Sequence, residues 1–173
     1  MYYAMLHIFI FTWDPTIKSM QSDTQSSYIF TILMMSLMTG GASFRSVYSY
    51  FEEKIFLTTK FMSLLCFVGF ALIFSEISYK TTLIGFILYE ISVGLFFPVY
   101  SKIKAIYLPE NQRGTLNNMF KVPFNLIVIY LLINTNKIFT IPEFVKLNLV
   151  ISGALFFITL IFFKERIDKR KLN

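Results

Sequence analysis

The sequence predicts an all-α integral membrane protein, and its composition and residue pattern carry this prediction. The 173 residues are 55% hydrophobic and only 15% charged, with a mean hydropathy of +0.62. These values lie far outside the range of ordinary soluble domains. The apolar residues come in continuous runs and do not alternate with polar ones, which argues against a membrane barrel. Helices are the remaining way to satisfy backbone groups in lipid.

Five apolar runs approach or exceed the ~20 residues needed to cross a bilayer. They are Tyr28–Tyr48, Phe56–Ile77, Thr81–Tyr107, Asn117–Ile133 and Phe144–Phe163. A sixth run, Tyr2–Trp13, has only 12 residues and is followed by Asp14, Pro15 and a polar stretch, so we expect a truncated first helix. No Lys or Arg precedes this run, which argues against a signal peptide. We expect a transmembrane helical bundle over residues 1–163 and a basic cytoplasmic tail over residues 164–173.

The distribution of cations predicts the orientation of the chain. If Tyr2–Trp13 counts as a crossing, 12 of the 16 Lys and Arg residues fall on the side of the carboxyl-terminal tail. Cytoplasmic loops carry such an excess, so we expect the tail in the cytoplasm of a multi-pass protein of the plasma membrane. Topology also accounts for the net charge of +6, and we therefore expect no nucleic-acid partner.

Residues that commonly carry catalysis or bind metals are sparse in this sequence. The single cysteine, Cys66, and the single histidine, His7, lie in separate apolar runs. Neither has a second His or Cys with metal-ligand spacing, and no nucleophile, base and orienting group can be assembled. We expect no metal, no cofactor and no enzymatic activity.

An acidic residue, Glu90, lies in the middle of the third complete run, with at least eight mostly apolar residues on either side. Facing lipid would be costly for it, so we expect it inside the bundle. Gly94, Pro98 and Ser101 follow near the same helix face. Gly94 would admit a neighbouring helix, and Pro98 would free a backbone carbonyl near Gly94. Glu90 is either a packing residue paired with a base or a coupling carboxylate in a cavity.

A second polar face is predicted in the next run, where Asn118, Lys121 and Asn125 recur at steps of three and four. Pro123 would kink this helix. The amide, ammonium and amide groups form the best candidate for an anion-facing surface. The alternative is that Lys121 extends to the membrane interface from a cytoplasmic helix end.

Arg45 follows LMTGGASF at the inner end of the first complete run. An arginine in this position usually anchors a helix among headgroups. It could instead hold the carboxylate of Glu52 or Glu53 in the following loop. Gly40 and Gly41, just before it, would permit close contact between helices.

The segment YEISVGLFFPVYSKIKAIYLPENQRGTLNNMFKVPFN, Tyr89–Asn125, resembles the molybdate-anion transporter family of the major facilitator superfamily. The shared features are an acidic residue before a glycine and an aromatic-Pro pair, then a Pro-Glu loop, then a pattern close to R-A-T-x-x-N-x-F-R-x-P-x-N. Gly114 stands where the family usually has Ala, and Lys121 stands where it usually has Arg. Arg grips an oxyanion with two parallel bonds, whereas Lys is a point charge.

The resemblance implies a fold, a function and a partner. The fold would be the six-helix carboxyl-terminal half of a major facilitator superfamily bundle, helices seven to twelve, with a missing amino-terminal half or a second chain completing it. The function would be transport of a small oxyanion, molybdate, by alternating access. The alternative is a non-transporting membrane scaffold or a degenerate transporter fragment.

The resemblance also implies roles for single residues. Three residues of the second polar face would bind the substrate: Asn118, Lys121 and Asn125. Two charged residues would couple transport or brace helices: Glu90 and Arg113. Three residues would pack or kink helices: Gly94, Pro98 and Pro123.

Overall fold

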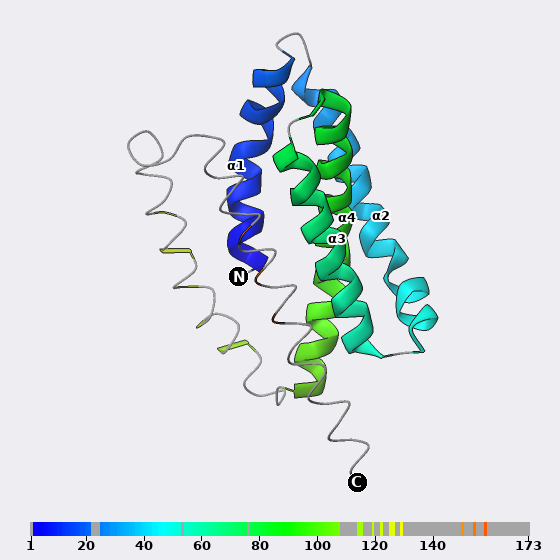
Figure 1. The fold of residues 1–173 in the computed structure, drawn as a ribbon. Coiled ribbons are helices and arrows are strands. Elements are labelled where there is room, and N and C mark those ends of the chain that lie inside the picture. The colour runs from blue at the N-terminus through cyan, green and yellow to red at the C-terminus, as the bar shows by residue number, and fades with distance from the viewer. Residues whose placement is uncertain are drawn as a thin grey trace.

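The computed structural model describes residues 2–21, 25–52, 54–75 and 77–107, together with single positions 114, 115, 119, 122, 125, 126, 129, 150, 154 and 158. The four longer ranges contain four helices (Figure 1). They are α1 (Tyr2–Met20), α2 (Ser26–Tyr50), α3 (Ile55–Ser75) and α4 (Tyr79–Tyr107). Among the described residues, α2, α3 and α4 are long and apolar enough to cross a membrane.

The prediction of an all-α membrane protein is confirmed. The helices α2, α3 and α4 match the first three complete runs to within two residues at each end. The runs Asn117–Ile133 and Phe144–Phe163 lie largely outside the described residues, and the tail 164–173 lies wholly outside them.

The prediction that the first helix ends at Trp13 is wrong. The helix α1 has 19 residues and continues through Asp14 and Pro15 to Met20. Pro15 removes only one backbone donor, which a helix tolerates near other stabilising contacts. One such contact is local, because the Lys18 ammonium donates to the Asp14 carboxylate at 2.8 Å, four positions away. Such a pair supports a helix across the position of the proline.

The helix α1 is also joined to α2. The Ser26 hydroxyl at the start of α2 donates a hydrogen bond to Asp14. One residue earlier on α1, the Trp13 ring lies 6.3 Å from the Phe30 ring of α2, measured between centroids. These contacts fix the end of α1 beside the beginning of α2.

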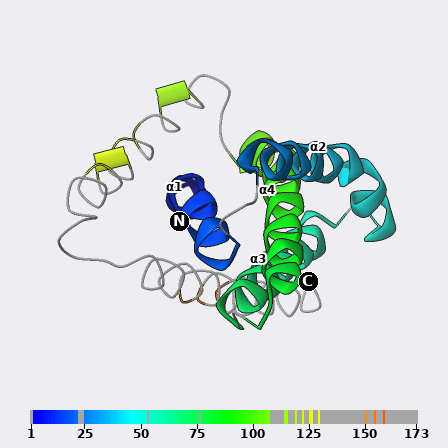
Figure 2. The ribbon, with the colours of Figure 1, turned by 90° about the horizontal axis from the view of Figure 1, so that it is seen from above.

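The helix α4 is the centre of the described bundle, with α2 and α3 on opposite sides of it (Figure 2). Two of its glycines make this arrangement possible. Gly85 and Gly94 are nine positions apart, which is about half a turn in projection at ~100° per residue. Gly85 therefore faces α3 and Gly94 faces α2. The chain direction makes α2 and α4 parallel, with α3 antiparallel to both (Figure 1).

Backbones approach closely at both glycine contacts. A Cβ atom added to Gly94 would lie 2.7 Å from the Gly41 nitrogen and 3.0 Å from the Gly40 Cα. A Cβ atom added to Gly85 would lie 2.7 Å from the Gly69 carbonyl oxygen. Small residues are the usual means of close helix packing in membranes, where apolar burial supplies little drive between helices.

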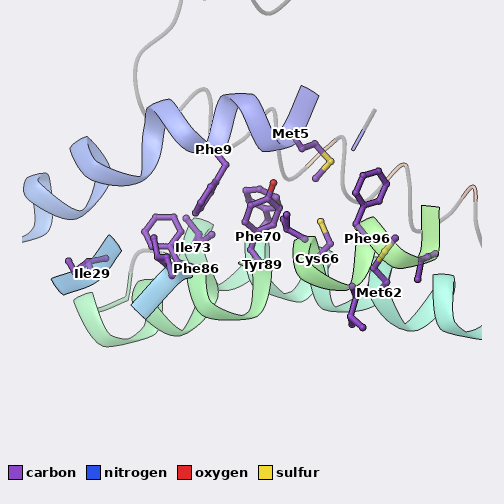
Figure 3. Packing of buried hydrophobic residues seen from close by; sticks show 14 of the residues in the cluster. Met5, Phe9, Ile29, Met62, Cys66, Phe70, Ile73, Phe86, Tyr89 and Phe96 are labelled. Atoms are coloured by element: carbon purple, nitrogen blue, oxygen red, sulfur yellow. The ribbon is translucent and has the colours of Figure 1, made fainter. Parts of the chain in front are cut away.

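Aromatic side chains fill the space between α1, α3 and α4 (Figure 3). The Tyr89 ring of α4 lies 4.5 Å from the Phe9 ring of α1 and 4.7 Å from the Phe70 ring of α3, measured between centroids. Phe9 also meets Phe86 edge to face at 5.3 Å. Such pairs stabilise packing beyond the area that they bury. This cluster joins α1 to the central helix.

Several hydroxyl groups of α2 and α3 are satisfied by the backbone of their own helix. Ser36, Thr39 and Ser43 of α2 each donate to the carbonyl oxygen four residues earlier, at 2.7 to 2.8 Å. Thr59 of α3 does the same at 2.8 Å. These bonds remove the need for water, so such hydroxyls are compatible with a membrane interior.

The turn between α2 and α3 is tight and carries a residue with left-handed backbone geometry. Glu52 has a φ angle of 51°, and its N–H donates to the Ser49 carbonyl at 3.0 Å. Its carboxylate pairs with the ammonium of Lys54. This hydrogen bond and the opposite charge lower the pKa of Glu52 below its ordinary value. Glu52, one of the two carboxylates considered for Arg45, is thus paired with Lys54.

The described cations lie at the two ends of the helices. Lys18 and Lys80 lie at the end where α1 finishes and α4 begins, whereas the others lie at the opposite end (Figure 1). The others are Arg45, Lys54, Lys60, Lys102 and Lys104. The described cations that the sequence assigns to the cytoplasmic side therefore all lie at the same end of the bundle.

Candidate functional site

The candidate site is a set of buried polar groups on α4. Ser78 begins this helix, because its hydroxyl oxygen accepts the Thr81 N–H at 3.3 Å, as an N-terminal cap does. The helix has 29 residues, a length of about 43 Å at ~1.5 Å per residue. Glu90 lies roughly 17 Å from its start by the same measure. The carboxylate therefore lies well inside the span and away from both helix ends.

Glu90 is buried between helices, with only 3% of its surface exposed. Its Oε2 atom has no hydrogen-bond partner in the described part of the chain. A buried acceptor without a partner costs about 1 to 3 kcal/mol, and more when it is charged. Proteins rarely keep such a group in a membrane without a function.

Two further side-chain oxygen atoms of α4 are buried without a described hydrogen-bond partner. Among the described residues, the Thr82 hydroxyl and the Tyr89 hydroxyl are also buried without a hydrogen-bond partner. Thr82 and Tyr89 are seven positions apart, two turns along one helix face. Figure 3 shows Tyr89 within the aromatic cluster, with its hydroxyl oxygen directed toward α1. The central helix therefore carries three buried polar atoms that no described residue partners.

The glycine and proline that follow Glu90 lie against α2. Gly94, one turn after Glu90, meets the backbone of Gly40 and Gly41. Pro98 has no N–H to donate to the Gly94 carbonyl. The oxygen of that carbonyl would lie 3.7 Å from a Cβ atom added to Gly41 of α2. The helix remains continuous through Pro98. Gly94 thus lies where α2 and α4 meet. The carbonyl of Gly94 faces α2 and receives no backbone hydrogen bond from Pro98.

The predicted anion-facing surface lies mainly outside the described residues. Asn125 is described, and it is helical and exposed. Four other predicted site residues lie outside the described part: Arg113, Asn118, Lys121 and Pro123. Of the predicted site residues, Glu90, Gly94 and Pro98 are described in their helix, and all three lie along α4.

Sequence reasoning did not single out Thr82, Tyr89, Gly69 or Gly85. The available signals were weak, since an isolated glycine in an apolar helix indicates a packing reason without naming the partner helix. Tyr89 adjoins Glu90, but tyrosines are also common at membrane interfaces. Within the described helices and turns, no three His, Cys, Asp or Glu residues come together as metal ligands.

The fold and the site define a multi-pass helical membrane protein with a buried carboxylate in its central helix. Comparison with curated proteins gives matches over 130 residues, or 72% of this chain. The molybdate-anion transporter of Danio rerio is 28% identical, and those of Xenopus tropicalis and Takifugu rubripes are each 26% identical. The chain is similar to the molybdate-anion transporters, as its resemblance predicts.

The similarity covers only part of those relatives. The matched region spans 27% of the Danio rerio and Takifugu rubripes proteins and 28% of the Xenopus tropicalis protein. The chain thus spans about a quarter of the length of the curated relatives that it matches. No protein-family model and no solved structure matches the chain.

Proposed function

We propose that this chain is part of a transporter that moves a small oxyanion, molybdate, across the plasma membrane by alternating access. The chain forms the carboxyl-terminal half of a major facilitator superfamily bundle, and the opposite wall of its pathway comes from further helices or a second chain. The proposed substrate rests on the similarity of the chain to the molybdate-anion transporters. The central feature in support is Glu90, a carboxylate buried in a membrane-spanning helix with an unpartnered oxygen.

The proposed mechanism assigns separate tasks to the two polar faces. Lys121, Asn118 and Asn125 bind the oxyanion through one positive charge and amide hydrogen-bond donors. Glu90 carries a proton or braces the moving helices, and Arg113 has the same two possible tasks. Gly94, Pro98 and Pro123 shape the helices that move. Half-bundles that rock against each other around a central site provide the physical basis.

The first test compares two lengths of protein in reconstituted vesicles. We expect saturable molybdate uptake from the chain joined to an amino-terminal half-bundle, and none from the 173-residue chain alone. A single wall cannot enclose a substrate path between two half-bundles. Saturable uptake by the purified monomer would contradict the need for a second wall. An inactive extended protein of normal abundance would contradict transport and favour a scaffold.

A second test concerns the charge at position 121. We expect Lys121→Ala to weaken apparent oxyanion affinity roughly 10-fold or more, because a charge-assisted hydrogen bond contributes about 1.5 kcal/mol or more. Lys121→Arg should retain or improve affinity, since its guanidinium offers two parallel donors. Uptake normalised to surface protein gives the comparison. If Lys121→Ala changes abundance but leaves affinity intact, Lys121 only anchors the helix at the interface.

A further inference from the structure

We propose that the ends of α2 and α4 form a binding site for the headgroup of an anionic phospholipid. Arg45 of α2 and Lys102 of α4 are its cationic ligands, and Tyr48 supports Lys102. The site is distinct from the buried groups around Glu90, and its occupation does not require transport.

The contacts around Tyr48 place a cation between the two helices. The Lys102 ammonium lies 4.1 Å from the centroid of the Tyr48 ring, a cation–π distance. The Phe44 ring stacks against Tyr48, with centroids 5.6 Å apart and planes inclined by 21°. Arg45 is three positions before Tyr48 on the same helix, which makes the two side chains neighbours on its surface. Tyr48 thus contacts Lys102 and neighbours Arg45 along α2.

Neither cation forms an ion pair with another described residue. Within the helices and turns that the structure describes, the ion pairs are Lys18–Asp14 and Lys54–Glu52. Neither pair includes Arg45 or Lys102. Arg45 is exposed and Lys102 is half-buried. A cation–π contact leaves the outer hydrogens of an ammonium free to donate to a phosphate oxygen.

Helix length places these residues at the level of the headgroups. The 25 residues of α2 and the 29 residues of α4 extend about 37 Å and 43 Å at ~1.5 Å per residue, beyond a hydrocarbon core of ~30 Å. The two helices are parallel, so their final turns emerge on the same side (Figure 1). The cation distribution assigns this side to the cytoplasm, whose leaflet carries the anionic lipids.

An exposed apolar strip beside Arg45 favours a lipid over a free oxyanion. Met38 precedes Arg45 by seven positions, on the same face of α2, and Met35 lies nearly one turn before Met38. Met38 is 70% exposed and Met35 is 63% exposed. A phosphate held by Arg45 and Lys102 would place its acyl chain along these methionines, toward the membrane interior. A free phosphate has no apolar part that could contact these methionines.

The test measures how phosphatidylserine stabilises the detergent-solubilised full chain against thermal unfolding. We expect phosphatidylserine to raise Tm, and phosphatidylcholine, inorganic phosphate and glycerophosphoserine to leave it unchanged. The double variant Arg45→Gln/Lys102→Gln should bind phosphatidylserine roughly 25-fold more weakly, from the contribution of two cations near a membrane surface. Lys80→Gln is the matched control, because it removes one exposed charge at the other end of α4.

Further variants keep the test decisive if the double variant unfolds. Arg45→Gln alone affects an exposed side chain and should weaken binding about 5-fold, whereas Lys102→Arg should retain it. Met38→Gln should weaken phosphatidylserine binding by disturbing the acyl-chain strip. An equal loss in Lys80→Gln would overturn the site, since it would reflect diffuse charge. Equal stabilisation by inorganic phosphate would overturn the lipid assignment, and unchanged affinity in Arg45→Gln would remove Arg45 from the site.

Discussion

Replacement of Gly94 by alanine is expected to lower the free energy of unfolding by about 3 kcal/mol. The new Cβ would lie 2.7 Å from the Gly41 nitrogen and 3.0 Å from the Gly40 Cα. These are backbone atoms, which cannot rotate away as the end of a side chain can. The helices α2 and α4 would have to separate along their contact, with loss of dispersion contacts on both sides. Equilibrium unfolding in mixed detergent measures the change.

Gly114→Ala is the matched control for this prediction. Gly114 is helical, and a Cβ atom added there would have no described heavy atom within 4 Å beyond those of its own helix turn. Alanine is better than glycine in a helix interior by about 1 kcal/mol, so this variant should be neutral or slightly more stable. Equal behaviour of the two alanine variants would show that close packing at Gly94 does not hold α2 against α4.

Replacement of Glu90 by leucine is expected to change stability and transport in opposite directions. Glu90 is 3% exposed, and its Oε2 atom has no hydrogen-bond partner in the described part of the chain. Removal of an unpartnered buried acceptor should raise the free energy of unfolding by about 1 to 3 kcal/mol. Oxyanion uptake by the extended transporter should fall to background if Glu90 is the proposed coupling carboxylate.

The opposite result would identify a bracing role for Glu90. If a basic side chain pairs with Glu90, loss of the carboxylate would leave a buried charge and cost about 3 to 5 kcal/mol. Unfolding of the purified protein and uptake normalised to surface protein separate the two roles. Ser101→Ala is the control, since Ser101 lies on α4 and is exposed. It should leave both measurements unchanged.

The sequence by itself determined the class of protein and most helix limits. Continuous apolar runs of membrane-spanning length require helices, because no other single segment satisfies its backbone in lipid. The limits of α2, α3 and α4 follow from the same runs. The interior position of Glu90 was also predictable, since an ionisable group in the middle of such a run avoids lipid. The resemblance around Tyr89–Asn125 indicated the transporter family.

Only the tertiary structure decided which groups meet. Asp14 and Pro15 look like a helix end in the sequence, yet the bond from Lys18 to Asp14 supports α1 through the proline. The pairing of Gly94 with Gly40 and Gly41 depends on which helix lies beside which face of α4. That choice is made by long-range packing, because a glycine permits close approach from any neighbour without specifying which one. For the same reason, the lack of partners for Glu90 and Tyr89 could be seen only once the surrounding helices were in place.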